Sequence, residues 1–171
     1  AAINKLAADD AVIATDVGAG LLTGHNIYEQ SKNRRFFTSQ GLGEMGFGLP
    51  GAIGAYFVDP ASQIICLNTD GAIMFNMQEL QLVKEHKIPL KLFIFNNSGY
   101  AMIKISQNNL FGARVAGSST SSGISFPEFG KLAELFGMQH IPLKNSPGWE
   151  NQLEEGLNND SAVLIEVIMN P

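Results

Sequence analysis

The chain has 171 residues, of which 45% are hydrophobic, and its formal net charge is −5. This length suits one domain with a single large core. The acidic balance and the lack of a Lys/Arg cluster exclude the charge pattern of a nucleic-acid-binding protein, and no apolar run is long enough to span a bilayer. We therefore expect a cytoplasmic protein without nucleic-acid or membrane partners. The one cysteine, Cys66, lies in an apolar run, which predicts a buried structural side chain.

The first third of the chain predicts strands separated by glycine-rich turns and helices. The helix that we expect before residue 60 contains Pro50 and several glycines. Glycine costs about 1 kcal/mol in a helix interior, so this helix should pack closely against a ligand or another backbone. The predicted elements are strands at 11–15 and 35–38, a glycine turn at 16–20, and helices at 21–30 and 45–58.

The middle of the chain predicts a strand, a tight turn, a helix and a second strand. Residues 64–67 and 92–95 are apolar runs. Between them, Ile73, Met77 and Leu80 recur at helical spacing. This pattern is typical of a βαβ unit, whose two strands are parallel and adjacent or nearly so.

The last third continues the alternation of helices and strands. Ser125 and Glu128 form a sequence capping box for one helix, and Ser146-Pro147 predicts the start of another. The whole pattern predicts an α/β fold with a doubly wound, mostly parallel six-stranded sheet and helices on both faces. The predicted elements are a helix at 100–107, a mobile Gly/Ser-rich loop at 109–124, a helix ending at 136, and strands at 139–143 and 162–168.

Two polar turns follow the two central strands. Asp70 follows the first strand and Asn97 the second, and both turns should emerge at the carboxyl edge of the sheet, where α/β sheets bind ligands. A carboxylate and an amide oxygen suit Mg²⁺, which completes its octahedron with water and phosphate oxygens. Asp70 could instead cap the following helix, but its pairing with Asn97 favours a metal. Helix starts at Gly71, Ala72, Tyr100, Ala101 and Met102 should offer unpaired N–H groups to a diphosphate.

Two segments resemble the thiamine diphosphate-dependent enzymes. Thr69-Asp70-Gly71 followed by Asn96-Asn97 is similar to that family's motif, in which Gly-Asp-Gly precedes Asn-Asn at similar spacing; Thr69 replaces the first glycine. Residues 38–55, TSQGLGEMGFGLPGAIGA, resemble the acetolactate synthase branch almost residue for residue. The resemblance covers essentially the whole chain. It implies that residues 1–171 are one domain, the C-terminal diphosphate-binding domain of a three-domain enzyme, and we expect the chain to be a truncated piece because it lacks an initiator Met.

The resemblance also implies roles for individual residues. The Gly43 carbonyl would accept from the aminopyrimidine of thiamine diphosphate, and Met45 would wedge between the two rings of the cofactor. Asn96 would stabilise its turn. Mg²⁺ would take the side chains of Asp70 and Asn97 and the Gly99 carbonyl. The implied cofactor-binding residues are Gly18, Ala19, Gly20, Gly43, Glu44, Met45, Asp70, Gly71, Ala72, Asn97, Gly99, Tyr100, Ala101 and Met102.

The implied activity is decarboxylation of a 2-oxo acid such as pyruvate, with ligation of the acyl carbanion to a carbonyl acceptor. The activating glutamate would come from a pyrimidine-binding domain on a neighbouring subunit of a homodimer or tetramer, so this domain alone should be inactive. FAD, if used, would bind another domain. Ser106 stands where biosynthetic acetolactate synthases carry tryptophan, which leaves a larger acceptor open. Alternatives are a simple 2-oxo acid decarboxylase, a non-catalytic assembly module, and a short subunit paired with a separate chain.

Several titratable residues receive no catalytic role. No glutamate in the chain has a position that would let it activate the cofactor, and the histidines lack the spacing of a base, metal ligand or nucleophile partner. We expect the histidines to be structural or surface residues and Glu79 to be solvated on its helix. The residues without a catalytic role are Glu29, Glu44, Glu79, Glu85, His25, His86 and His140.

Overall fold

The computed structural model describes residues 2–18, 21, 24, 28–29, 33–112 and 114–169. Its centre is a sheet of six strands in the order β2-β1-β3-β4-β6-β5, and every neighbouring pair is parallel. The predicted six-stranded sheet is confirmed. The strands are β1 (Val12–Thr15), β2 (Arg35–Thr38), β3 (Ile64–Thr69), β4 (Lys91–Asn96), β5 (Gln139–Leu143) and β6 (Val163–Ile168).

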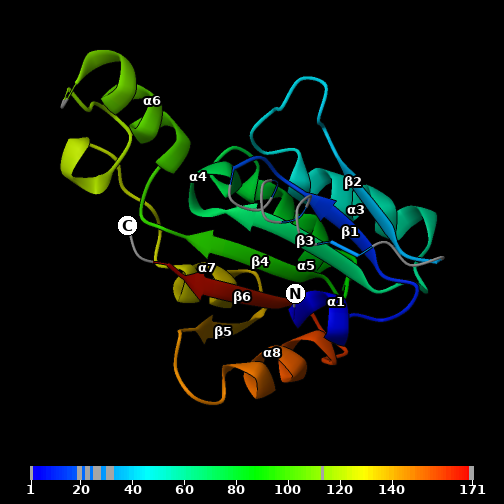
Figure 1. The fold of residues 1–171 in the computed structure, drawn as a ribbon. Helices are drawn as coiled ribbons and strands as arrows, with labels where there is room; N and C mark the ends of the chain where they lie inside the picture. The colour runs from blue at the N-terminus through cyan, green and yellow to red at the C-terminus, as the bar shows by residue number, and fades with distance from the viewer. Residues whose placement is uncertain are drawn as a thin grey trace.

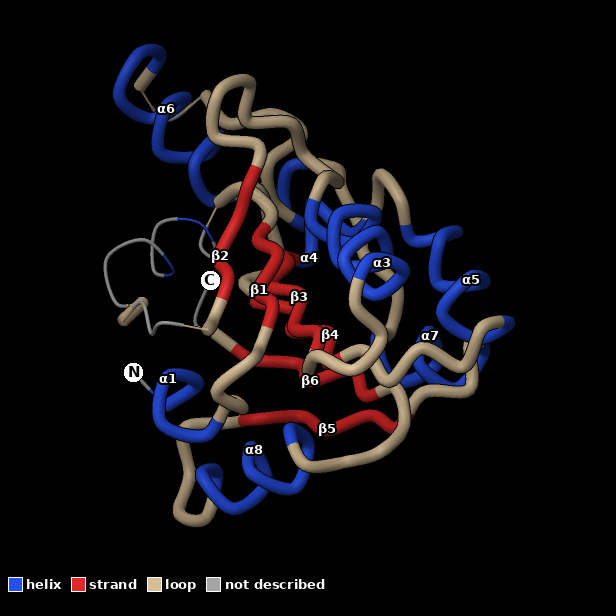
Figure 2. The backbone as a smooth tube through the Cα atoms, turned by 90° about the vertical axis from the view of Figure 1, so that its right-hand side faces the viewer, coloured by secondary structure: helices blue, strands red, loops and turns tan. Residues whose placement is uncertain are grey.

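Helices cover both faces of the sheet, as Figures 1 and 2 show. The helices α1 (Ala2–Leu6) and α8 (Trp149–Leu157) lie on one face. The other face carries α3 (Gly48–Val58), α4 (Asp70–Ile73), α5 (Leu80–Glu85) and α7 (Phe129–Leu135). The described part of the chain contains no helix that is both long enough and apolar enough to cross a bilayer.

The helix α6 (Ala101–Phe111) differs from the others because none of its residues is buried. In Figure 1 it projects away from the end of the sheet. Its apolar side chains are at least two-fifths exposed. They are Met102, Ile103, Ile105, Leu110 and Phe111.

The central strands β3 and β4 are mostly apolar because helices cover both of their faces, with polar residues only toward the strand ends. Every residue of β3 is buried, and Cys66 is fully buried, as predicted. Burial raises the pKa of the Cys66 thiol, which keeps it protonated at neutral pH.

The strand order places a topological switch point between β1 and β3. From β1 the chain moves outward to β2, then returns to pair β3 on the other side of β1. Ligands of open α/β sheets bind in the crevice at such a point, outside the carboxyl ends of the strands. The turns after β1 and β3 therefore flank the expected ligand crevice.

Two helices predicted around the site are shorter or broken in the structure. The helix predicted from residue 45 begins at Gly48, because Gly46 has a φ of +95° that a right-handed helix cannot accommodate. The central helix is interrupted after α4, and a 3₁₀ turn, Met77–Glu79, precedes α5. The interruption falls at Asn76, whose φ of −141° is not helical.

Differences also occur in the last third of the chain. The helix predicted at 100–107 extends to Phe111, and the predicted mobile loop is tied down in part, because Ser118 is fully buried. The capping box at Ser125 is wrong: α7 begins at Phe129 without a side-chain cap. The start predicted at Ser146 is wrong as well, because Gly148, with a φ of +88°, precedes α8. Most of the helix predicted at 21–30 lies outside the described residues.

Candidate functional site

The two polar turns meet at the carboxyl edge of the sheet. β3 and β4 are direct neighbours, and Thr69 pairs with Phe95 at the end of their ladder. Asp70 begins α4 immediately after β3, and Asn97 follows β4. The predicted βαβ unit, with adjacent parallel strands, is therefore confirmed.

Asp70 ties the two turns together through its carboxylate. Its Oδ2 accepts from the backbone N–H of Asn97 at 3.1 Å and of Gly99 at 3.0 Å, and its Oδ1 accepts from the Gly71 N–H at 2.8 Å. Asp70 is fully buried. Burial raises the pKa of the Asp70 carboxyl, and the backbone hydrogen bonds oppose that shift.

Asp70 does not act as the side-chain cap of its helix. That position belongs to Thr69, whose Oγ1 accepts from the Ala72 N–H at 3.2 Å. Thr69 has a φ of −125°, so threonine fits where the resembling motif carries glycine. The capping alternative for Asp70 is therefore wrong, and its carboxylate remains available for a ligand.

Asn97 has an unusual environment. Its Oδ1 is buried and has no hydrogen-bond partner among the described residues. Buried polar atoms are nearly always paired, so an unpaired amide oxygen needs an explanation. The next residue, Ser98, has a φ of +60°, a conformation uncommon outside glycine. Strain of this kind is typical of ligand-binding turns.

Asn96 holds that turn in place. Its Oδ1 accepts from the Ser98 N–H at 3.1 Å, and its Nδ2 donates to Glu166 Oε1 at 2.6 Å. The other oxygen of Glu166 lies 2.9 Å from His140 Nε2. Asn96 therefore stabilises the turn, and His140 on β5 contacts the Glu166 side chain that holds Asn96.

These atoms fit a hard divalent cation. A buried carboxylate, which forms no ion pair with a described Lys or Arg, lies in the turn next to an unpaired amide oxygen. Mg²⁺ binds one or two protein carboxylates and uses water and phosphate for the rest of its shell. The described residues contain no group of three or more His, Cys, Asp or Glu side chains that could hold a metal.

The predicted backbone donors divide into two groups. Three are already used within the chain: the Gly71 N–H by Asp70, the Ala72 N–H by Thr69, and the Tyr100 N–H by the Ser118 carbonyl at 2.8 Å. The expectation that these three are unpaired is wrong, because the turns fold back on themselves. Ala101 and Met102, in the first turn of α6, have N–H groups without a partner among the described residues.

A cavity of about 790 Å³ brings most of the predicted residues together. Gly43 and Glu44 do not line it and lie exposed on the turn before Met45, and Gly71 and Ala72 lie buried behind it. Ala19 and Gly20 lie outside the described residues. The predicted residues that line the cavity are Gly18, Met45, Asp70, Asn97, Gly99, Tyr100, Ala101 and Met102.

Residues 16–167 match the family model for the thiamine pyrophosphate enzyme, C-terminal TPP binding domain. The chain belongs to this family. The matched segment contains both polar turns and every described residue that lines the cavity except Met169.

The chain is also similar to acetolactate synthase large subunits. It is 35% identical to the acetolactate synthase large subunit of Porphyra purpurea over 163 aligned residues. The alignment covers 95% of this chain and 27% of that relative. The chain is 36% identical over 169 residues to the probable large subunit of Methanococcus aeolicus (99% and 27%) and 36% identical over 160 residues to isozyme 2 of Escherichia coli strain K12 (92% and 28%). The chain thus spans about a quarter of the length of these relatives.

Residues that the sequence did not predict also line the cavity of the thiamine pyrophosphate-binding domain. Lys104 lines the cavity and is half-buried; helical spacing from Tyr100 would have revealed it. Ser118 and Ser119 also line the cavity, and Ser119 forms an isolated antiparallel bridge with Gly99. Nothing in the sequence indicates that bridge, because it depends on a loop folding back onto the turn that contains Asn97.

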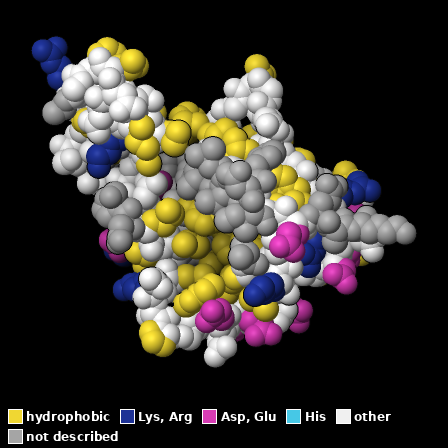
Figure 3. All heavy atoms as spheres, viewed as in Figure 1, with side chains coloured by type: hydrophobic (Ala, Val, Ile, Leu, Met, Phe, Trp, Pro, Cys, Tyr) yellow, Lys and Arg dark blue, Asp and Glu magenta, His cyan; other side chains and the backbone are white. Residues whose placement is uncertain are grey.

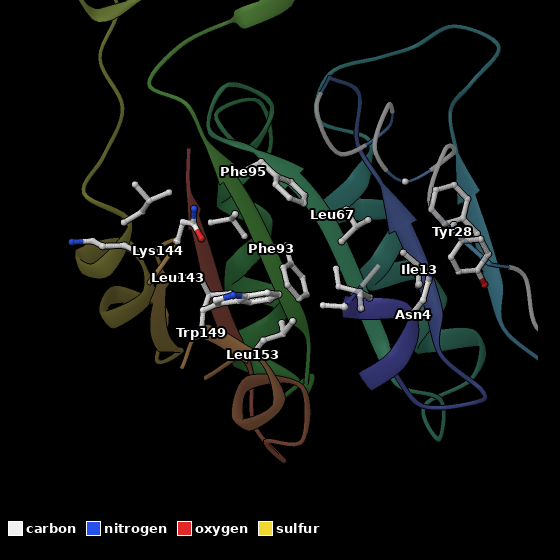
Figure 4. Close-up of a pocket in the computed structure, with 17 residues that line it drawn as sticks. Asn4, Ile13, Tyr28, Leu67, Phe93, Phe95, Leu143, Lys144, Trp149 and Leu153 are labelled. Atoms are coloured by element: carbon white, nitrogen blue, oxygen red, sulfur yellow. The ribbon is translucent and has the colours of Figure 1, made fainter. Parts of the chain in front are cut away.

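The thiamine pyrophosphate-binding domain has a second cavity, of about 440 Å³, on the face covered by α1 and α8. Figure 4 shows Ile13, Leu67 and Phe93 from the strands and Trp149 from α8 around it. Hydrophobic side chains gather over the middle of this face in Figure 3. None of the residues in the two motif turns lines this cavity, so it is separate from the candidate cofactor site.

Proposed function

We propose that this chain is the diphosphate-binding domain of an acetolactate synthase-like enzyme and that it holds thiamine diphosphate through Mg²⁺. The observation that carries the proposal is the buried, unpaired Oδ1 of Asn97 in the turn held by the Asp70 carboxylate. A divalent ion would satisfy both groups at once. Family membership and the similarity to acetolactate synthase large subunits support the same conclusion.

The residues divide between the two ends of the cofactor. Asp70, Asn97 and the Gly99 carbonyl would hold the metal, and the free N–H groups at the start of α6 would bind diphosphate oxygens, aided by the helix dipole. Gly18, together with the turn at Ala19 and Gly20, would offer further backbone contacts. Gly43, Glu44 and Met45 would hold the aminopyrimidine end.

Bound thiamine diphosphate supplies the carbanion chemistry that cleaves a 2-oxo acid next to its carbonyl group. The protein must orient the cofactor, exclude water and bind the substrate. Lys104 is the only Lys or Arg among the described residues that line the cavity, and no described acid pairs with it. Its ammonium group suits the carboxylate of a 2-oxo acid.

The domain would work only with a partner subunit. Asp70 is the only Asp or Glu among the described residues lining the cavity, and three backbone N–H groups hold its carboxylate. No acid there is free to activate the aminopyrimidine. We therefore assign the activating glutamate to a pyrimidine-binding domain of a neighbouring subunit, in a homodimer or tetramer. The exposed apolar side chains of α6 suit such an interface. We also assign the protein to the cytoplasm.

Ser106 bears on the size of the carbonyl acceptor. Ser106 is exposed, and its hydroxyl donates to the Met102 carbonyl at 3.0 Å, so it does not line the described cavity. Because this small side chain does not reach the cavity, it leaves room for an acceptor larger than a second pyruvate, such as an aldehyde or a sugar.

Product analysis tests this function. The whole protein that contains the domain is incubated with pyruvate, thiamine diphosphate and Mg²⁺, with and without an added aldehyde. Acetolactate or another ligated product is expected. Acetaldehyde alone would instead identify a simple 2-oxo acid decarboxylase, and cofactor binding without turnover would identify a non-catalytic module.

A further inference from the structure

The turn that carries Met45 is fixed at Gly46 by two side chains from distant parts of the sequence. The Gly46 N–H donates to Asp16 Oδ1 at 3.0 Å, and Asn76 Nδ2 donates to the Gly46 carbonyl at 2.7 Å. Gly46 is itself buried. Both of its backbone polar groups are thus held by side chains from outside the turn.

Packing restricts the same residue. A Cβ on Gly46 would lie 2.7 Å from Asn76 Nδ2 and 2.8 Å from the Cβ of Phe75, and its φ of +95° favours glycine. At Gly46 the backbone of the turn therefore lies so close to Phe75 and Asn76, just after α4, that a residue with a Cβ would clash. The position of Met45 depends on that approach.

Asp16 forms the second half of the attachment. It follows β1, is 1% exposed, and accepts from the N–H of Gly48 at 2.7 Å as well as from Gly46. Gly48 begins α3, and the residue in the N-cap position, Phe47, has no side-chain oxygen to offer. A carboxylate at a helix N-terminus satisfies an orphan donor and interacts favourably with the helix dipole.

Asn76 connects this turn to the candidate metal turn. The N–H groups of Phe75 and Asn76 donate to the Ala72 and Ile73 carbonyls, each at 3.2 Å, so the backbone from Asp70 to Asn76 is one hydrogen-bonded unit. Its first residue carries the candidate metal ligand, and its last holds the turn of Met45. The unit therefore fixes the distance between the two.

We infer that Asn76 and Asp16 are positioning residues that hold Met45 in the wall of the cavity that Asp70 and Asn97 also line. Neither Asn76 nor Asp16 lines the cavity itself, so both act through the backbone of Gly46. The inference rests on the proposed function in one respect, namely that the ligand of the cavity is thiamine diphosphate.

The first test is a double-mutant cycle on cofactor affinity. Asn76→Asp keeps the size of the side chain but places an oxygen against the Gly46 carbonyl. In the whole protein with excess Mg²⁺, calorimetric titration should show about tenfold weaker binding of thiamine diphosphate. Asn151→Asp, on an exposed position of α8, is the matched control and should change nothing.

The cycle is completed with Met45→Ala. If Asn76 acts through Met45, the effect of Asn76→Asp should fall below about twofold in the Met45→Ala background, because coupled residues are not additive. An equal loss of affinity in both backgrounds, or no loss in the wild-type background, would overturn the inference.

The second test needs no cofactor. Hydrogen exchange of the peptide that contains Gly46 and Gly48 should be faster in Asn76→Asp than in Asn151→Asp, while β3 and β6 exchange at equal rates in both. Equal exchange at Gly46 would overturn the inference. If the wild-type protein binds no thiamine diphosphate, the proposed function fails, and this test still decides whether Asn76 holds the turn. If Asn76→Asp does not fold, Asn76→Ser replaces it in both tests.

Discussion

Asp70 joins two turns and at the same time presents a negative charge. Its two carboxylate oxygens accept hydrogen bonds from the backbone N–H groups of Gly71, Asn97 and Gly99. Burial raises the pKa of this carboxyl, and the backbone hydrogen bonds oppose that shift. The same bonds fix the orientation of its two oxygens. The carboxylate is therefore prepared for a cation before any cation binds, which is how rigid binding sites reduce the cost of ordering.

Lys104 should determine affinity for the substrate rather than for the cofactor. A charge-assisted hydrogen bond to a carboxylate is worth roughly 1.5–3 kcal/mol, so Lys104→Ala should raise the KM for pyruvate about tenfold or more. The dissociation constant of thiamine diphosphate should stay within about twofold of the wild-type value.

Steady-state kinetics and cofactor titration of the whole protein check this prediction together. Lys5→Ala, on an exposed position of α1, is the matched control. A weaker affinity for thiamine diphosphate with an unchanged KM for pyruvate would mean that Lys104 binds the cofactor instead.

At the scale of elements, the start of α6 is packed tightly against the start of α4. A Cβ on Gly71 would lie 2.3 Å from Cε1 of Tyr100 and 2.5 Å from its Cδ1. On the other side, a Cβ on Gly99 would lie 2.7 Å from the Ser118 carbonyl oxygen. The glycines of the two motif turns are thus needed because aromatic and backbone atoms occupy the space beside them.

Two Gly→Ala substitutions in helices should have opposite effects. Gly71→Ala should lower the free energy of unfolding by about 1–3 kcal/mol, because the Tyr100 ring must move. Gly54→Ala should raise it by about 0.5–1 kcal/mol, because the new Cβ in α3 meets no described atom within 4 Å outside the helix's own backbone and its chain neighbours. Urea unfolding measures both. A Gly71→Ala variant as stable as the wild type would show that Tyr100 is not packed there.

Lys91 at the start of β4 gives a pH dependence with a definite sign. Its Nζ donates to the carbonyls of Asn159 and Ser161, and burial lowers the pKa of Lys91 to about 8. Between about pH 8 and 10.5 the unfolded chain holds a proton that the folded chain has released, so stability rises with pH across that window. Below pH 8 both states are protonated and this contribution is constant.

Lys91→Met isolates the effect. The quantity to compare is the difference in the free energy of unfolding, wild type minus variant. This difference should increase by about 2 kcal/mol between pH 7.5 and pH 10. Urea unfolding at the two pH values gives the difference. Parallel pH curves for the two proteins would contradict the lowered pKa of Lys91.

The elements were predictable where the apolar pattern alone determines them. β1, β3, β4 and β6 follow from mostly buried apolar runs, and the adjacency of the Asp70 and Asn97 turns follows from the βαβ rule. The edge strands β2 and β5 are only partly buried, so their pattern is weaker. The start of α3 and the interruption at Asn76 were not predictable. They depend on contacts between residues far apart in sequence, such as Asn76 with Gly46, which no local pattern contains. The same reason applies to the bridge between Gly99 and Ser119.

At the scale of the whole molecule, the domain leaves apolar surface uncovered near its site. α6 has no buried residue, and Leu110 and Phe111 are 73% and 64% exposed. Contiguous apolar surface of this kind marks an interaction site. We expect the neighbouring subunit to cover it and to close the cavity over the cofactor.

The isolated chain should therefore lack activity. With thiamine diphosphate and Mg²⁺, the 171-residue chain should release no CO₂ from pyruvate above the rate of the cofactor in buffer. Mixing it with the remaining domains of the same protein should restore turnover. Appreciable decarboxylation by the chain alone would contradict the assignment of the activating glutamate to another domain.

The central claim is that Asp70 and Asn97 share one divalent ion that binds a diphosphate. The most direct measurement is a crystal structure of the protein grown with thiamine diphosphate and Mg²⁺, with Asp70→Asn as the matched variant. We predict an ion about 2.1 Å from an oxygen of each of the two side chains and from the diphosphate, and its absence in the variant. A bound cofactor whose metal contacts neither Asp70 nor Asn97 would contradict the account.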